Sequence, residues 1–204
     1  MDVKHLTDIF SSISAVIDSN KDYLIELDQQ NGDGDLGISM SDGFHGVIEY
    51  LKTCPETDLG RALNKCGDAF NEAAPSSLGT ILAFGMKGMA RSLKGKSDAG
   101  LAEFADALEA GIANIMAKAG SKPGEKTILD SLAPGAAALK ANAACGSHDA
   151  AQQAAKAAAD GSEATKQMKA VWGRAHYYAE KSIGVLDGGS VVGALIFQGI
   201  ANAV

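Results

Sequence analysis

The chain has 204 residues, 46% hydrophobic and 21% charged, which are values typical of a single soluble globular domain over residues 1–204. Its formal charge of −7 at pH 7 argues against nucleic acid and anionic membranes as partners, because no basic stripe is present to meet their phosphates. No long apolar run, leader pattern or CxxC pair occurs, so we expect no membrane span, no signal peptide and a cytoplasmic protein with reduced cysteines.

Apolar residues recur at helical spacing in five segments of the N-terminal half. These segments are residues 3–17, 20–27, 44–51, 59–70 and 76–89. Asn20 is expected to cap the second segment, and Ser76 or Ser77 the fifth, because these side chains accept hydrogen bonds from the first free backbone amides of a helix.

The C-terminal half continues the helical pattern. Residues 101–115 form one apolar stripe, and residues 133–159 are so rich in alanine that their helices must approach closely, with a turn at 146–149. Residues 160–162 are expected to separate this stretch from a helix that reaches Trp172, and Ser190 to cap a last helix ending at Val204. No segment alternates like a strand, so the predicted fold class is an all-α bundle of about eight antiparallel helices.

In such a bundle the loops after helices two, four and six and after the last but one fall at the same end. Those loops are residues 28–37, 75–80, 120–127 and 183–190, and each is rich in Gly, Ser, Thr or Asp. Hydroxyl groups and free backbone amides at helix starts are groups that bind phosphate. The sequence therefore predicts a phosphate-binding rim at this end.

Three aspartates, Asp28, Asp33 and Asp35, lie within eight residues among glycines. Carboxylates held so close repel one another unless a cation lies between them. Mg²⁺ prefers oxygen ligands and often completes its shell with water and substrate phosphates. The pattern predicts a metal site that serves phosphate chemistry.

Two other interpretations apply to this motif. Asp and Gly are common turn formers, so a plain solvated loop is one alternative. An EF-hand is the other, and its register fails: counted from Asn31, position six is Leu36 rather than Gly, and position twelve is Asp42 rather than Glu.

Four segments, in order and at similar separations, resemble the L subunit of dihydroxyacetone kinase over nearly the whole chain. They are Leu27-Asp28 with residues 32–37, Leu78-Gly79-Thr80, residues 122–127 leading to Asp130, and residues 173–175 with 182–184 and Asp187-Gly188-Gly189. The resemblance implies an eight-helix antiparallel bundle closed into a barrel, with ADP or ATP held at one end.

The resemblance also implies roles for single residues. Asp28, Asp33 and Asp35 would hold two Mg²⁺ ions that bridge the nucleotide phosphates, and Arg174 would join them as a catalytic group. The residues implied to contact the nucleotide are Gly37, Ile38, Ser39, Ser76, Ser77, Thr80, Gly120, Thr127, Ile128, Arg174, Asp187, Gly188 and Gly189. The alternatives are ordinary: Arg174 stacked on Trp172 at the surface, Thr127 as a plain helix cap, and Gly188-Gly189 as a common loop.

The chain departs from the family pattern in two places. Leu36 stands where the family has a histidine, so one phosphate donor is missing. Residues 71–77 replace a glycine-rich loop, and Glu72 brings negative charge there, while Ser76 and Ser77 offer hydroxyl and amide donors instead. Both departures bear on nucleotide affinity and substrate identity.

The resemblance implies a phosphotransferase subunit that acts with a K-type partner, which holds dihydroxyacetone or a related short ketose covalently on its own histidine. The phosphoryl donor would be ATP or a phosphoprotein of the sugar phosphotransferase system. Two other classes remain open: a regulatory module that binds Mg²⁺ and nucleotide without turnover, and a helical interaction protein whose aspartates form only a turn.

Overall fold

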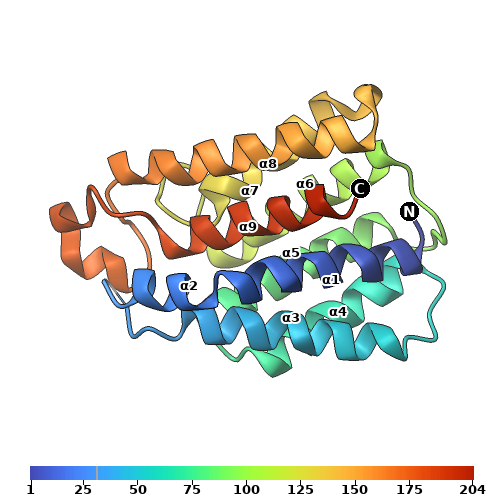
Figure 1. Cartoon of the computed structure of the whole chain (residues 1–204), viewed down its shortest axis with the longest axis horizontal. Coiled ribbons are helices and arrows are strands. Elements are labelled where there is room, and N and C mark those ends of the chain that lie inside the picture. The colour runs from blue at the N-terminus through green and yellow to red at the C-terminus, as the bar shows by residue number, and fades with distance from the viewer. Residues whose placement is uncertain (31) are drawn as a thin grey trace.

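The computed structural model describes residues 1–30 and 32–204, so Asn31 of the aspartate motif lies outside the described residues. Within that part of the chain the fold is all-α, as predicted, with nine α-helices and no strand (Figure 1). The helices are α1 (Val3–Ser19), α2 (Lys21–Asp28), α3 (Leu36–Lys52), α4 (Leu59–Ala73), α5 (Ser77–Ser92), α6 (Leu101–Ala119), α7 (Leu129–Ala141), α8 (Ser147–Ala164) and α9 (Gly188–Asn202). Short 3₁₀ segments are η1 (Ala143–Cys145), η2 (Thr165–Gln167) and η3 (Arg174–Ser182). No helix among the described residues is both long and apolar enough to span a bilayer.

Eight of the helices pack in a closed ring. Helix α1 packs on α3, each helix from α3 onward packs on the next, and α9 packs back on α1. The ninth is α2, which has eight residues and packs mainly on α3. The expected count of eight helices is therefore one too low for the described residues, because α2 stands beside the ring as a separate element.

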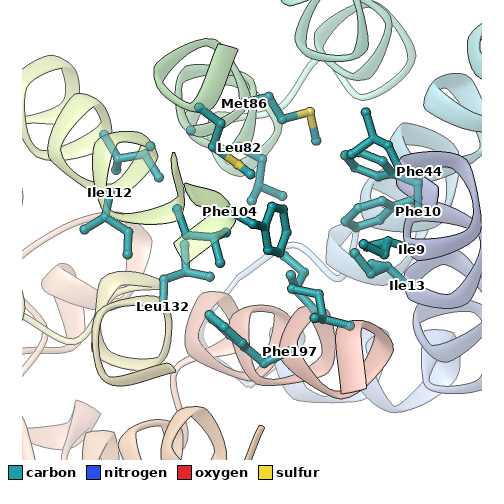
Figure 2. A pocket seen from close by; sticks show the side chains of 18 residues that line it. Ile9, Phe10, Ile13, Phe44, Leu82, Met86, Phe104, Ile112, Leu132 and Phe197 are labelled. Carbon is teal, nitrogen blue, oxygen red and sulfur yellow. The ribbon is translucent and has the colours of Figure 1, made fainter. Parts of the chain in front are cut away.

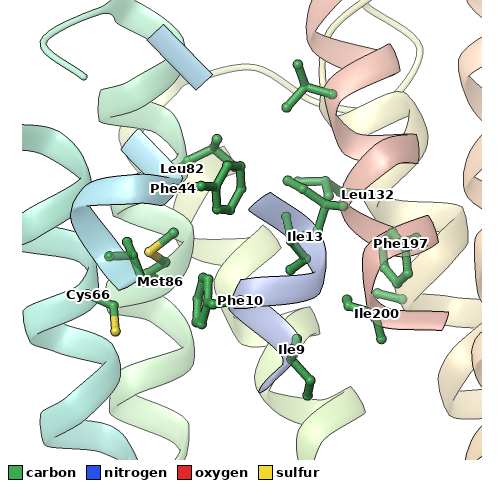
Figure 3. Packing of buried hydrophobic residues seen from close by; sticks show 14 of the residues in the cluster. Ile9, Phe10, Ile13, Phe44, Cys66, Leu82, Met86, Leu132, Phe197 and Ile200 are labelled. Atoms are coloured by element: carbon green, nitrogen blue, oxygen red, sulfur yellow. The ribbon is translucent and has the colours of Figure 1, made fainter. Parts of the chain in front are cut away.

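The centre of the ring is filled by apolar side chains. Figure 3 shows Phe10 of α1 between Met86 of α5 on one side and Phe197 of α9 on the other. Phe44 and Phe70 meet edge to face, with ring centroids 5.0 Å apart. An apolar cavity of about 80 Å³ remains inside this core, and side chains from several helices point into it (Figure 2). Each fully buried Leu, Ile or Phe side chain stabilises the fold by roughly 1.5–3 kcal/mol, so this core is the main source of stability.

The alanine-rich region differs from its prediction in one respect. The turn at Gly146 is present, but α8 runs without a break through residues 160–162, and the expected helix up to Trp172 is wrong. Gly161 lies against α7, where a Cβ would overlap the carbonyl oxygen of Asp130. The glycine therefore serves close helix packing rather than a turn, and tertiary contact overrides its weak helix propensity.

The helix caps also differ in part from expectation. Ser76 caps α5 by accepting a hydrogen bond from the Gly79 amide at 3.1 Å. Asn20 makes no side-chain cap and instead donates to the carbonyl of Val16. Asp187, rather than Ser190, caps α9, because its carboxylate accepts from the Ser190 amide at 2.6 Å.

The loops after α2, α4, α6 and α8 lie at one end of the antiparallel ring, as predicted, and both chain termini lie at the other end (Figure 1). The segment between α8 and α9, residues 165–187, is the longest of these loops and bulges beyond the helix ends beside the α2–α3 turn (Figure 1).

Substitution Gly161→Ala tests the close packing of α8 on α7. In an ordinary helix this change stabilises a protein by roughly 0.5–1 kcal/mol. Here the new Cβ would overlap backbone, and we expect a loss of about 1–3 kcal/mol in the free energy of unfolding, measured by urea denaturation. Ala159→Ser, which adds one atom at an exposed position of α8, is the control and should change stability by less than about 0.5 kcal/mol. A Gly161→Ala protein as stable as the parent would contradict the packing argument.

Candidate functional site

The three aspartates of the motif converge at the start of α3. One carboxylate oxygen from each of Asp28, Asp33 and Asp35 lies within 4.8 Å of the others. Asp28 is half-buried at the end of α2, and its Oδ2 atom accepts hydrogen bonds from the amides of Gly34 at 2.8 Å and Asp35 at 3.1 Å. Gly34 has φ of +80°, a conformation that side chains rarely adopt, and this lets the loop wrap around Asp28.

The negative charges of the three carboxylates exceed the positive charge that nearby side chains supply. Burial, and then the negative charges of Asp33 and Asp28, raise the pKa of Asp35 above its ordinary value. Arg174, whose Nη2 atom lies 2.6 Å from Oδ2 of Asp33, opposes that rise. A further cation among the three carboxylates would relieve the repulsion, and a set of hard oxygen donors suits Mg²⁺. The residues present therefore fit a divalent cation.

Arg174 comes from η3, so its ion pair with Asp33 joins the α8–α9 segment to the α2–α3 turn. The indole Nε1 of neighbouring Trp172 donates to the Glu125 carboxylate. The ion pair places Arg174 beside the aspartates, and its contact with nucleotide phosphates stays a prediction.

The α6–α7 loop, residues 120–128, is ordered by its own side chains. Asp130 accepts hydrogen bonds from the amides of Gly124 and of Thr127, the latter at 2.7 Å, and Thr127 Oγ1 accepts from the Leu129 amide at 3.2 Å. The Thr127 side chain thus binds a free backbone amide at the start of α7. Ile128 is only 2% exposed and packs with the core.

Asp187, Gly188 and Gly189 bring the start of α9 against two other loops. A Cβ on Gly189 would lie 3.3 Å from the Ile128 amide nitrogen, and one on Gly188 would crowd the Leu36 side chain. Leu36 is 8% exposed and packs in the core, which is a physical reason for an apolar residue at this point of departure from the family pattern. Burial raises the pKa of Asp187 to about 7; the Ser190 amide hydrogen bond opposes the rise, and the charge of nearby Asp130 adds to it.

The remaining candidates lie at the same end but do not all meet. Gly37 is buried where a Cβ would overlap the Lys21 carbonyl of α2, whereas Ile38 is 46% exposed and Ser39 is half-buried. The described contacts of Ser76 and Thr80 stay within the α4–α5 turn, where Thr80 Oγ1 donates to Asn71 at 3.0 Å. Ser77, at the start of α5, and Gly120, at the end of α6 with φ of +76°, are exposed.

Sequence reasoning missed one residue of this end entirely. Lys126 is 3% exposed, has a positive φ of 61° and directs its ammonium group beneath the α8–α9 segment. Lys126 belongs to the sequence segment 122–127, but a lysine in a polar loop is ordinarily exposed to solvent, so nothing in the sequence indicated its burial. Only the folded contacts reveal the burial.

Comparison with known proteins connects this geometry to a family. Residues 30–202, which are most of the chain, match the sequence pattern of the DAK2 domain family. The chain belongs to the DAK2 domain family. The chain is 31% identical over 184 residues to the ADP-binding subunit DhaL of PEP-dependent dihydroxyacetone kinase 1 from Listeria innocua, covering 89% of this chain and 87% of that protein.

Longer proteins match as well. A putative 3,4-dihydroxy-2-butanone kinase from Solanum lycopersicum is 33% identical over 190 residues, covering 90% of this chain and 32% of that protein. The chain spans about a third of the length of several such curated relatives. The dihydroxyacetone kinase of C. freundii, solved in complex with AMP-PNP and Mg²⁺, superposes with a TM-score of 0.76 at 22% identity, covering 97% of this chain and 33% of that one. This likeness establishes a shared fold.

The raised pKa of Asp187 predicts a pH dependence of stability. A carboxyl whose pKa is higher in the folded state binds its proton more tightly there, so its contribution to stability is complete below about pH 4 and is lost as pH rises toward about 7. We expect Asp187→Asn to remove a decline on the order of 2–4 kcal/mol in the free energy of unfolding between pH 4 and 8, measured by urea denaturation. Asp8→Asn, at an exposed position of α1, should keep the parent's slope. Equal slopes in the parent and Asp187→Asn would show that the Asp187 environment is not the cause.

Proposed function

We propose that this chain is the nucleotide-binding L-type subunit of a dihydroxyacetone kinase-like phosphotransferase. It binds ADP or ATP through two Mg²⁺ ions at one end of the helical barrel, as a single cytoplasmic domain over residues 1–204. The observation that carries the proposal is the convergence of Asp28, Asp33 and Asp35 within 4.8 Å, in a chain of the DAK2 domain family.

The proposed roles follow from charge and position. Asp28, Asp33 and Asp35 would hold the Mg²⁺ ions, which when bound supply positive charge that neutralises the phosphate oxygens and favours in-line phosphoryl transfer. Arg174 exchanges part of its pairing with Asp33 for a phosphate, which its planar guanidinium can hold in a bidentate manner. Residues 37–39 open α3 directly after the aspartates, where free backbone amides favour an anion.

Other candidate residues surround this centre in the proposal. Ser76 and Ser77 offer amides at the start of α5, with Thr80 one turn further along. Gly120 and Thr127 would border the adenine end, and Asp187, Gly188 and Gly189 would close the pocket at the start of α9. Ile128 is included only through its backbone, because its side chain is buried in the core.

The acceptor and the partner are inferred from the relatives. The Listeria relative is named as an ADP-binding subunit of a PEP-dependent kinase, and this chain covers 87% of its length, which supports a separate L-type subunit. The relatives' names include kinases for dihydroxyacetone and for 3,4-dihydroxy-2-butanone, which are both short hydroxyketones. We therefore propose a K-type partner that holds a short ketose, with a phosphotransferase-system phosphoprotein or ATP as phosphoryl donor.

One observation favours a second candidate function, a regulatory module that binds Mg²⁺ and nucleotide without turnover. The last turn of α4 carries an exposed Glu72 where the family has a glycine-rich loop, and the Ser76 hydroxyl is already engaged as a helix cap. An added negative charge beside the phosphates weakens their binding or distorts their position.

Substitution Asp33→Asn tests the metal site. In the parent we expect ADP binding, followed by titration calorimetry, to require Mg²⁺. Loss of one charged ligand should weaken binding roughly 10- to 100-fold, the range expected for a charge-assisted contact. Asp42→Asn, at an exposed position on α3, is the matched control and should bind like the parent. Unchanged Mg²⁺ and ADP binding in Asp33→Asn would favour a helical interaction protein instead.

Adding a K-type subunit loaded with dihydroxyacetone separates the kinase from the regulatory module. We expect radiolabelled phosphate to move from Mg-ATP, or from a phosphorylated phosphotransferase-system protein with ADP present, to the ketose, and this transfer should be lost in Asp33→Asn. Tight nucleotide binding by the parent without any transfer would favour the regulatory module.

A further inference from the structure

Lys126 forms an unusual internal contact at the candidate site. Its side chain is buried, and its Nζ atom donates to the backbone carbonyl oxygens of Thr165 at 2.8 Å, Met168 at 3.3 Å, Ser182 at 2.7 Å and Val185 at 2.6 Å. An ammonium group has three N–H donors, so the longest of these contacts shares a donor with another. Lysine itself adopts a left-handed φ of 61°, which costs energy for a residue with a side chain, and the contacts must offset that cost.

The four carbonyl groups come from both limbs of the α8–α9 segment. Thr165 and Met168 follow α8, whereas Ser182, the last residue of η3, and Val185 lead toward α9. One ammonium group therefore holds together two stretches of backbone that are about fifteen residues apart in the sequence. Other described bonds also join them. The Gly184 amide donates to the Lys166 carbonyl at 2.8 Å, the Ala170 amide donates to Ser182 Oγ at 3.0 Å, and Lys169 Nζ lies 2.8 Å from a carboxylate oxygen of Glu180. Lys126 differs from these because it bonds to both limbs from a separate loop.

The segment has little apolar burial to hold it in place. Among the side chains described between residues 165 and 187, the buried ones are small: Thr165, Ala170 and Ser182. Of the large ones, Trp172 is 43% and Tyr177 86% exposed, whereas Met168 and Leu186 are half-buried and Leu186 packs against the main core. Because burial of small side chains contributes little hydrophobic free energy, the charged hydrogen bonds of Lys126 take the place of a local core.

The segment in turn carries groups of the candidate site. Arg174, on η3, pairs with Asp33, and Asp187 ends the segment and caps α9. The Asp187 amide also donates to Thr165 Oγ1 at 3.1 Å, which links it to the same limb that Lys126 binds. The position of Arg174 over the aspartates thus depends on the two limbs staying together.

We propose that Lys126 is a positioning residue: its buried ammonium group holds the two limbs of residues 165–187 together and thereby places Arg174 against Asp33 at the phosphate site. This link between the two limbs, called the tether below, is inferred from the contacts of Lys126 alone. Its effect on phosphate binding rests on the proposed function. Methionine of similar length would leave the carbonyls without a donor, and the planar fork of arginine cannot direct its donors at four oxygens around one atom.

The single tryptophan of the chain gives a direct test, because Trp172 lies in this segment and donates to Glu125. In Lys126→Met we expect its emission to shift to the red, its quenching by acrylamide to rise at least about twofold, and trypsin to cleave after Arg174 faster. Lys118→Met, at an exposed position of α6, is the matched control and should match the parent. Helix content by circular dichroism should be retained; if Lys126→Met fails to fold, Lys126→Arg should show the same changes to a smaller degree.

A double-substitution cycle decides whether Lys126 acts through Arg174. Lys126→Met and Arg174→Gln are each expected to weaken Mg-ADP binding about tenfold, and together they should weaken it about tenfold rather than a hundredfold, since both remove the same contact. Independent, multiplying effects would overturn the positioning role, as would a Lys126→Met protein that keeps the parent's Trp172 emission and trypsin resistance.

Failure of the proposed function gives a different pattern. If the parent does not bind Mg-ADP, the phosphate-site assignment fails. The tether is then decided by fluorescence and proteolysis alone, with Asp33→Asn expected to release the Arg174 end of the segment and Lys126→Met to release both limbs.

Discussion

Three carboxylates held within 4.8 Å of one another repel, and the end of the bundle is built around that repulsion. Two backbone amides bind the Asp28 carboxylate and Arg174 binds Asp33. The pKa of Asp35 stays raised because its carboxyl is partly desolvated and lies beside the negative charges of Asp33 and Asp28. The cluster is thus partly neutralised by the protein and leaves room for added positive charge. A ring of helices supplies the rigid frame that prevents the carboxylates from moving apart.

Close approach of helices gives that frame its shape. Small residues let backbone meet backbone at several crossings, as at Gly161 against α7 and Gly37 against α2. At the site end this has a direct effect, because Gly37 brings the start of α3 against α2, the helix that ends at Asp28. The packing of glycine and the gathering of aspartates are therefore parts of one arrangement.

Much of this could be predicted from the sequence. Apolar periodicity gave the all-α class and the end at which the loops meet, and the spacing of Asp28, Asp33 and Asp35 indicated that their carboxylates converge. The errors arose where local patterns have more than one solution. Asp187 and Ser190 are both good helix caps, and Gly161 suits a turn as well as a tight helix crossing, so only tertiary contacts decide between them.

The burial of Ile128 and Lys126 was beyond such reasoning for a different reason. Neighbouring residues in one loop face opposite environments, Ile128 toward the core and Lys126 toward carbonyl groups some forty to sixty residues later in the chain. A backbone with positive φ at a lysine reverses the expected direction of its side chain. The spacing of apolar residues in the sequence does not indicate this change of direction.

The placement of the two termini has a practical consequence. Both leave the ring at the end away from the aspartates (Figure 1). An affinity tag, a fluorescent protein or a surface linker attached at either end would leave the opposite mouth open to solvent. The domain can therefore be immobilised through its C-terminus with the aspartate face presented outward, an orientation suited to flow-based studies of small anions and of docking proteins alike.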